Sequence, residues 1–352
     1  MNRNIDIMGD SLDCVTINAY SGYYLDSKRL KQSASGGGCS VIAESIILKG
    51  GMVFGVSYTE DFKGAVYCCA NNISELEKLK GSKYIESSKE VFDGKNYRNV
   101  FHVVGERLQE GKIILFIGLG CDIAALNHYI ESKDINNKNL YTVELICQGP
   151  TVTKVGSDYI DYLEKKYRAN VVGFSVRYKK DGWIPPYIHA EFDNGKTHEE
   201  RFYESDYGYA FSIYSKKNCY KCRFKGNNHQ ADVVVGDYWG IDNQDPNYNK
   251  DGVSVLFTRT SKGELLLSWI DQSIFCIHKA DMDKAITYNP RYLTPNTMKV
   301  KWETFDQNIK RYALHKAVIK TDGYVKYIAR KTHVLTLLNK ILPCSIVSLI
   351  KR

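Results

Sequence analysis

"KIILFIGLGCDIAALNHYIES" spans residues 112–132 and places a strand, a glycine turn and a helix in direct succession. Its first seven residues are almost wholly apolar, which is typical of a strand buried in a sheet. Gly118 and Gly120 then end the apolar run, and the apolar side chains of residues 121–132 recur at helical spacing. This strand–turn–helix unit indicates an α/β fold.

The same alternation continues on both sides of this unit. We expect helices over residues 36–48 and 157–167, and strands at residues 52–58 and 140–147. The sequence therefore predicts an α/β protein with a mixed sheet as its core and helices flanking the sheet.

The pattern becomes less regular after about residue 170, where strands and turns dominate. A hairpin is expected over residues 187–203, because Asn194-Gly195 is a strong turn signal. Strands are expected at 231–241 and 252–260, followed by a helix at 262–270. We expect three parts: an α/β part at 1–170, an α+β part at 171–304 with the CxxC and GDYWG motifs, and a basic, helical tail at 305–352.

The composition is that of a globular protein, with 43% hydrophobic and 25% charged residues in a chain of 352. The first 15 residues contain no apolar signal-peptide region, and no stretch reaches about 18 unbroken apolar residues. We therefore expect a cytoplasmic protein, in which the ten cysteines serve metal or redox chemistry more readily than disulfides. The net charge is +8, but Lys and Arg are scattered along the chain until the C-terminus, which does not favour nucleic acid; an anionic ligand or an anionic membrane surface explains the charge equally well.

"SASGGG", residues 33–38, is a glycine cluster that leads directly into the expected helix at 36–48. Such a junction can present backbone N–H groups and a helix N-terminus to a phosphate, or it can be a plain tight turn. The turn at Gly118–Gly120 is a second junction, at the carboxyl end of a strand where ligands of open sheets gather. Neither junction is a GxGxxG fingerprint, so both interpretations stay open.

Four cysteines form a candidate metal or redox site. Cys219 and Cys222 form a CxxC motif, which occurs in zinc, iron–sulfur and dithiol sites. Cys121 and Cys147 follow two expected strands, whose ends converge on one edge of a sheet. The four thiols could complete one metal site, or Cys121 and Cys147 could simply be small buried residues.

Charged and aromatic residues supply further candidates. Arg177, Lys179 and Lys180 could bind an anion or could lie at a solvated strand end. Asp237 could be an active-site carboxylate or a turn cap, and Trp239 could stack on a planar ring or pack in the core. The candidate catalytic residues are Arg177, Lys180 and Asp237.

Eight motifs occur in an order that resembles the beta subunit of coenzyme F(420)-reducing hydrogenase and dehydrogenase, in the form found in bacterial polysaccharide loci. The resemblance covers roughly residues 14–270. The motifs are SASGGG (33–38), GSKYIESS (81–88), FIGLGCDIAALNHYI (116–130), ELICQGP (144–150), VRYKKDGW (176–183), CYKCRFK (219–225), ADVVVGDYWGI (231–241) and KDGVSVLFTRTSKG (250–263).

The resemblance implies a flavoprotein that binds FAD and a [4Fe-4S] cluster. It implies that Cys121, Cys147, Cys219 and Cys222 bind the cluster, or zinc, or no metal in a divergent member. The implied flavin contacts are Ser33, Ser35, Gly36, Gly37, Gly38, Gly81, Ser82, Lys83, Tyr84, Gly118 and Gly120.

The chain departs from the family's pattern at three places. It lacks the ferredoxin-like segment that many relatives carry before the glycine loop. The family's GTPCQ is here GLGCD, and its CHG is here CQG, which changes residues beside the implied cofactors.

The resemblance also implies an activity and partners. The expected activity is an oxidoreductase that acts on a small molecule, such as a sugar or nucleotide-sugar intermediate of polysaccharide biosynthesis. We expect a separate electron donor, such as ferredoxin or a reduced deazaflavin, and an oligomer is compatible with the pattern. The alternatives are a zinc-bound or cofactor-free binding or assembly partner in glycan synthesis, and a subunit of a larger redox complex.

Residues 332–352 combine a broad apolar stripe with cationic ends. They could lie peripherally on the inner face of an anionic membrane. The interpretation we favour is a C-terminal helix that packs on the body of the protein or on a second copy.

Overall fold

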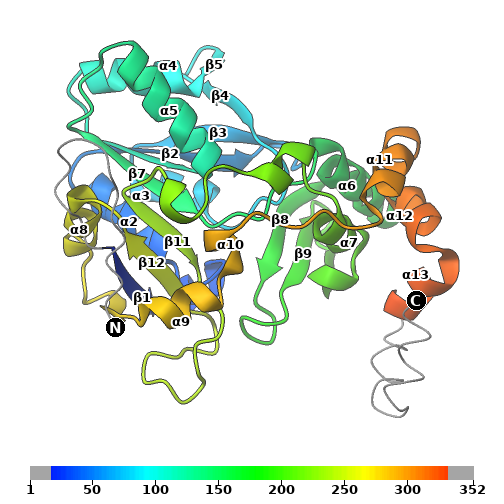
Figure 1. The fold of residues 1–352 in the computed structure, drawn as a ribbon. Helices are drawn as coiled ribbons and strands as arrows, with labels where there is room; N and C mark the ends of the chain where they lie inside the picture. The colour runs from blue at the N-terminus through cyan, green and yellow to red at the C-terminus, as the bar shows by residue number, and fades with distance from the viewer. Residues whose placement is uncertain (1–16, 332–352) are drawn as a thin grey trace.

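The computed structural model describes residues 17–331, and its main feature is a ten-stranded mixed sheet (Figure 1). The strands, in spatial order, are β13 (Phe275–Lys279), β1 (Asn18–Tyr24), β12 (Ser254–Thr258), β11 (Val233–Asp237), β7 (Leu140–Leu145), β6 (Ile114–Gly118), β2 (Met52–Tyr58), β3 (Ala65–Ala70), β4 (Ser88–Phe92) and β5 (Tyr97–Asn99).

The centre of this sheet is parallel. β2, β6, β7 and β11 run in one direction, and β1 shares it because β12 is antiparallel to both β1 and β11. The carboxyl ends of these five strands therefore lie at one edge of the sheet. Open α/β sheets bind their ligands at such an edge.

Helices cover both faces of the main sheet. β6 divides its side chains between the faces, so Leu115 packs beneath α2 while Ile114 and Phe116 pack beneath α4 and α5. The helices around this sheet are α1 (Ser27–Gln32), α2 (Gly38–Leu48), α3 (Ile73–Leu76), α4 (Val100–Gln109), α5 (Gly120–Ser132), α8 (Ser261–Ser268), α9 (Met282–Thr287) and α10 (Pro290–Leu293).

A smaller sheet and five helices lie beside the edge of the main sheet that holds the carboxyl ends of its parallel strands, which we call the ligand edge (Figure 1). Its three strands are antiparallel, and β8, β9 and four of its helices share one hydrophobic core. The elements are β8 (Val171–Tyr178), β9 (Tyr187–Phe192), β10 (Thr197–Arg201), α6 (Thr153–Tyr167), α7 (Asp206–Ile213), α11 (Trp302–Arg311), α12 (Leu314–Asp322) and α13 (Tyr324–Lys331). Four short 3₁₀ turns complete the described chain: η1 (Glu77–Leu79), η2 (Phe202–Glu204), η3 (Lys217–Lys221) and η4 (Gly226–Asn228).

The α/β class and most of the expected elements are confirmed, with shifted ends. The helix expected at 157–167 begins earlier, at Thr153, and the strand expected at 140–147 ends at Leu145. The division of the chain at residue 170 stays a prediction. The main sheet runs across that position, because β7 pairs with β11.

The expected tail is helical as far as the structure describes it, through α11, α12 and α13. The expectation for residues 332–352 falls outside the described residues. No helix within residues 17–331 is long and apolar enough to cross a membrane.

Candidate functional site

The glycine loop at residues 33–38 packs closely on β1 and β12. The Ser35 hydroxyl donates a hydrogen bond to the Val253 carbonyl (2.9 Å), and the Gly38 N–H donates one to Ser254 Oγ (3.1 Å). Gly37 has a left-handed φ of 93°, and a Cβ there would collide with the ring of Tyr24. The glycines therefore have a packing reason that needs no ligand, so a phosphate could meet only the remaining N–H groups of the α2 start.

The "GSKY" loop is held in place by its last two residues. Lys83 Nζ donates hydrogen bonds to the carbonyls of Leu79 (3.0 Å) and Lys80 (2.7 Å), while Tyr84 stacks on Phe211 with ring centroids 4.1 Å apart. Removal from water lowers the pKa of Lys83 to about 7. Gly81, at a φ of 78°, has no atom within 4 Å of the position of a Cβ, so its backbone faces open space. Unlike the loop at 33–38, this loop leaves room for a ligand to approach.

Arg177 links β8 of the smaller sheet to β11 of the main sheet. Its guanidinium donates to Asp237 Oδ1 (2.7 Å) and to the Ala34 carbonyl (2.9 Å). Burial opposes the charge of Arg177, but the Asp237 carboxylate together with Tyr84 and Tyr203 outweighs it and raises the pKa of the guanidinium. Two predicted residues, Arg177 and Asp237, thus meet at the ligand edge beside the glycine loop.

Two tryptophans complete this ion pair. Trp183 Nε1 donates to Asp237 Oδ1 (3.1 Å), and its ring stacks on Trp239 with centroids 5.0 Å apart and planes 6° apart. Arg177 lies over the Trp239 ring at 5.6 Å. Trp239 therefore stacks on a ring of the chain itself, and only its partly exposed remainder could meet a ligand.

The two lysines after β8 point in different directions. Lys179 is 5% exposed, and its Nζ donates to the carbonyls of Leu30 (2.8 Å) and Ser35 (2.7 Å). Burial, and then the charge of Arg177, lowers the pKa of Lys179 to about 7. Lys180 instead lies at the surface and pairs with Glu199 of β10 (2.5 Å). The structure thus separates the candidate catalytic residue Lys180 from Arg177 and Asp237.

The four candidate cysteines come from three separate segments and gather in one region. Cys121 lies in the first turn of α5, and Cys147 follows β7. Cys219 lies in η3, and Cys222 directly follows η3. Partial removal from water raises the pKa of Cys121 most, the charge of Asp122 comes next, and Cys147 and Cys222 raise it further. The thiols are therefore close enough to influence each other's ionisation.

Backbone contacts hold these segments together. The Gly149 N–H donates to Cys147 Sγ (3.1 Å), and a Cβ on Gly149 would lie 2.7 Å from Cys219 Cβ. Across residues 17–331, no group of three or more His, Cys, Asp or Glu side chains is arranged to hold a metal ion. The thiols share one region, and their assignment as ligands stays a prediction.

A buried pair that the sequence analysis missed lies next to the cysteine region. Glu144 of β7 is 1% exposed, and its carboxylate is 2.6 Å from His229 Nδ1. His229 Nε2 donates to the Tyr292 carbonyl (2.9 Å), since a carbonyl can only accept. A Cβ on Gly120 would lie 2.6 Å from Glu144 Oε1, so this pair supports the α5 start that carries Cys121. The charged Glu144 inside an apolar strand was the available signal, whereas nothing in the sequence marked His229.

Two buried hydroxyls near the site have no hydrogen-bond partner in the described part of the chain. They belong to Tyr58, at the end of β2, and Tyr207, on α7. Burial raises the pKa of both hydroxyls, and Tyr84 of the "GSKY" loop raises both further; the two hydroxyls also lie close enough to interact weakly with each other, although not in a hydrogen bond of normal geometry. Buried polar groups are normally satisfied, so this position suits a polar ligand atom or a water.

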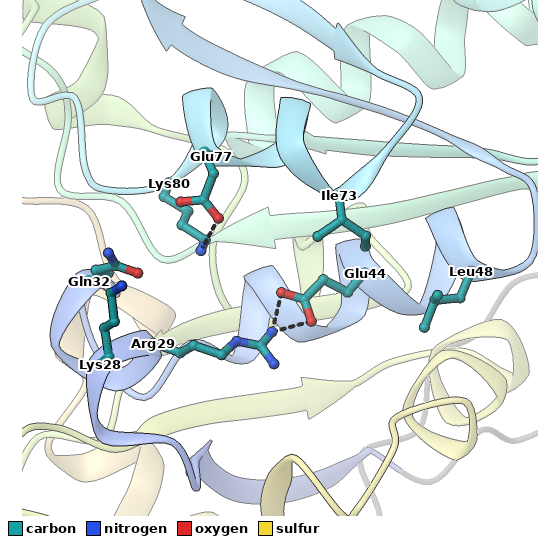
Figure 2. A pocket seen from close by; sticks show the side chains of 8 residues that line it. All are labelled: Lys28, Arg29, Gln32, Glu44, Leu48, Ile73, Glu77 and Lys80. Carbon is teal, nitrogen blue, oxygen red and sulfur yellow. Dashed lines mark hydrogen bonds and ion pairs between the residues drawn. The ribbon is translucent and has the colours of Figure 1, made fainter.

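A separate groove of about 620 Å³ lies beside α1 and α2 (Figure 2). Arg29 pairs with Glu44 and Lys80 with Glu77, so four of its five charged side chains neutralise each other. None of the predicted site residues lines this groove. Its lining is Lys28, Arg29, Gln32, Glu44, Leu48, Ile73, Glu77 and Lys80.

Comparison with known proteins identifies the family of the central part of the chain. Residues 111–283 match the family described as the C terminus of the beta subunit of coenzyme F(420) hydrogenase/dehydrogenase. These residues belong to the F(420) hydrogenase/dehydrogenase beta-subunit family. The matched segment contains β6 to β13 and all four candidate cysteines. No curated protein sequence matches the chain significantly.

A solved structure shares the fold of this chain. It is a chain of the F(420)-reducing [NiFe] hydrogenase complex from Methanosarcina barkeri, studied as a xenon derivative. The TM-score is 0.50 at 16% sequence identity, over 78% of this chain and 90% of that chain. At this identity the likeness concerns the fold. The family consists of redox enzyme subunits, which indicates a redox role of the beta-subunit kind.

The departures from the family's motifs have structural explanations. Asp122, which stands where the beta-subunit family has Gln, is buried, pairs with Lys89 (2.8 Å) and accepts a hydrogen bond from the Tyr67 hydroxyl (3.0 Å). Gln148, which stands for His, donates to the Phe211 carbonyl (3.3 Å). Both residues therefore make polar contacts within the chain, which explains how the fold accommodates each change.

Proposed function

We propose that this chain is an FAD-dependent iron–sulfur oxidoreductase of the cytoplasm that reduces a small molecule, such as a sugar or nucleotide-sugar intermediate of polysaccharide biosynthesis. One observation carries the proposal. Thiols from three distant segments gather at the sheet edge that also holds the Arg177–Asp237 pair and the glycine loop.

The four cysteines supply the donor set that a cluster needs. Cys121, Cys147, Cys219 and Cys222 would hold a [4Fe-4S] cluster through their sulfurs. The Gly149 contacts and the Glu144–His229 pair would keep the three segments in place around it. Zinc could use the same four thiols.

The flavin region is proposed between the "GSKY" loop and the smaller sheet. Gly81 leaves backbone accessible there, and the hydroxyls of Tyr58 and Tyr207, which make no hydrogen bond of normal geometry in the described chain, could donate to a ligand. When bound, a flavin can exchange two electrons as a hydride and pass them singly to a cluster. Arg177 would hold an anionic group at this position, because Asp237 and the Ala34 carbonyl fix its guanidinium.

Electrons would arrive from a separate donor, either ferredoxin or a reduced deazaflavin. A subunit role in a larger redox complex is a second proposal, and the fold shared with a chain of a hydrogenase complex favours it. The third, a cofactor-free member that acts as an assembly partner in glycan synthesis, is favoured by the packed glycine loop, whose glycines are explained without a ligand.

The absorption spectrum of anaerobically purified protein tests the proposal. Flavin predicts bands near ~450 nm, and a [4Fe-4S] cluster predicts a broad shoulder near ~400 nm. The Cys222→Ser variant should lose the shoulder, while Cys68→Ser, on β3, should keep it. A folded protein that shows neither feature after cofactor reconstitution would favour the assembly role instead.

A further inference from the structure

A short stretch around the CxxC motif carries five cations and no acidic residue. Between Asp206 and Asp232 the sequence contains no Asp or Glu. The cations fall within ten residues and are Lys216, Lys217, Lys221, Arg223 and Lys225. Such a cluster favours an anionic partner where the charges reach solvent and are not neutralised by the chain itself.

The fold exposes four of these cations and neutralises one of the four. Lys225 is buried, and its Nζ donates a hydrogen bond to the Cys147 carbonyl (2.6 Å). Lys216 is exposed but pairs with Glu86 (2.6 Å). The other three are exposed and form no ion pair with any carboxylate of residues 17–331. We call these three the basic face: Lys217, Lys221 and Arg223.

Two cations of the basic face flank the second cysteine of the CxxC motif. One directly precedes Cys222 in the sequence, and one directly follows it. The next residue, Phe224, packs against the start of α5, where a Cβ on Gly120 would lie 2.9 Å from Phe224 Cβ. This turn of α5 carries Cys121, whose side chain is exposed. The basic face therefore lies beside thiols that a partner can approach from solvent.

The third cation of the basic face is held by α11. The Trp302 ring donates through Nε1 to the Ser215 carbonyl (2.8 Å), and the ammonium group of Lys217 lies over the same ring at 5.8 Å. Asp306, one turn further along α11, pairs with Lys310 (2.6 Å). The charge of Lys217 thus stays available at the surface, in a position that the packing of Trp302 fixes.

Exposed cations that no carboxylate neutralises suit a partner with an acidic surface. A small anion is held by donors that converge in a cleft, whereas separate cations at a surface attract and orient a charged protein. We propose that the basic face docks an acidic electron-transfer protein over the four candidate cysteines.

This inference rests on the proposed function, because the partner would deliver its electrons to a cluster held by those cysteines. In each encounter one electron would pass from the reduced partner to the cluster, so that the partner is oxidised and the cluster is reduced by one electron.

Binding of an oxidised, acidic [2Fe-2S] ferredoxin to the full chain tests the proposal without any turnover. Titration calorimetry should show a complex at about 0.01 M ionic strength that weakens steeply at about 0.15 M, where the Debye length falls from about 30 Å to about 8 Å. A basic cytochrome c should not bind. Replacing the basic face should raise the Kd for ferredoxin about tenfold or more at low salt. That variant carries Lys217→Gln, Lys221→Gln and Arg223→Gln, and it should keep the iron content of the wild type.

A matched control removes three exposed lysines that lie outside this region. It carries Lys95→Gln, Lys133→Gln and Lys138→Gln, and its Kd should stay close to that of the wild type. Equal losses in the two variants, an unchanged Kd in the basic-face variant, or no complex between the wild type and ferredoxin would overturn the proposal. The iron content of the wild type reports separately on the proposed function. Binding that depends on the basic face in a chain without iron would reject the cluster and keep the docking face.

Discussion

Replacing Lys179 by methionine should change how the stability of this protein depends on pH. The amino group of Lys179 is buried between β8 and the glycine loop, where it bonds the carbonyls of Leu30 and Ser35. Burial, and then the charge of Arg177, lowers its pKa from 10.5 to about 7. Methionine has a similar length and no charge, so the variant removes this titration from the folded state.

The sign follows from proton binding. Between pH 7 and pH 10.5 the unfolded chain holds a proton on Lys179 that the folded chain has released, so folding becomes more favourable as the pH rises. Below pH 7 both states are protonated, and the penalty for burying the charge is fully present. At about 1.4 kcal/mol for each pKa unit, the full effect is about 5 kcal/mol, of which about 2 kcal/mol develops between pH 7 and pH 9.

Urea unfolding of both proteins from pH 7 to pH 9 measures this effect. The free energy of unfolding of the wild type, minus that of Lys179→Met, should rise by about 2 kcal/mol over this range. The neighbouring Lys180 is a matched control, because it lies at the surface in a pair with Glu199. Lys180→Met should show a flat difference. A flat difference for Lys179→Met as well would refute the burial of an amino group against the glycine loop.

Three further substitutions test other contacts of the site. Arg177→Gln should lower the free energy of unfolding by about 3–5 kcal/mol, because it leaves the Asp237 carboxylate in a partly buried site without its cation. A loss below about 1 kcal/mol in chemical denaturation would show that water replaces the guanidinium. Gly37→Ala should lower the free energy of unfolding by about 2–4 kcal/mol, because of its left-handed φ and the collision with Tyr24. The control is Gly50→Ala, at a φ of 75° in open space, which should lose only the energy of the backbone strain. Equal losses in the two variants would contradict the packing explanation of the loop. Tyr207→Phe should leave stability unchanged or raise it by up to about 1 kcal/mol, since its buried hydroxyl makes no hydrogen bond of normal geometry in the described chain. A loss above about 1 kcal/mol would show that the hydroxyl is satisfied in solution.

The sequence predicted those parts of the fold that depend on local pattern. β6 and α5 lie where the apolar run and the helical spacing place them, because each signal is contained in a short stretch of chain. β1, in contrast, was not predicted. Its sequence, NAYSGYY, has a glycine and a serine, and the strand is completed by β12 and β13, which lie more than 200 residues away.

The sequence could predict that candidate residues lie at the ends of strands, but not which of these residues contact each other. Arg177 and Asp237 were both recognised as candidates, yet their ion pair depends on β11 lying next to β7 and on the position of β8 beside that edge. These are tertiary arrangements that no local pattern encodes. The four cysteines were proposed from their motifs and from the strand ends, and their role as ligands stays a prediction.

The different directions of Lys179 and Lys180 were within reach of the sequence. Successive side chains of an extended chain alternate, so Arg177 and Lys179 share a side and Lys180 faces away. The structure buries the first two and exposes the third. Treating the three cations as one anion-binding group overlooked this alternation.

The central claim is that four cysteines from three segments hold one iron–sulfur cluster. Iron and acid-labile sulfide should be measured per chain in the anaerobically purified wild type and in the single Ser variants of Cys121, Cys147, Cys219 and Cys222. We predict about four iron and four sulfide ions in the wild type, a loss of most of both in each of the four variants, and full retention in Cys68→Ser. Zinc in place of iron, or iron that survives the loss of Cys121 or Cys147, would contradict the claim.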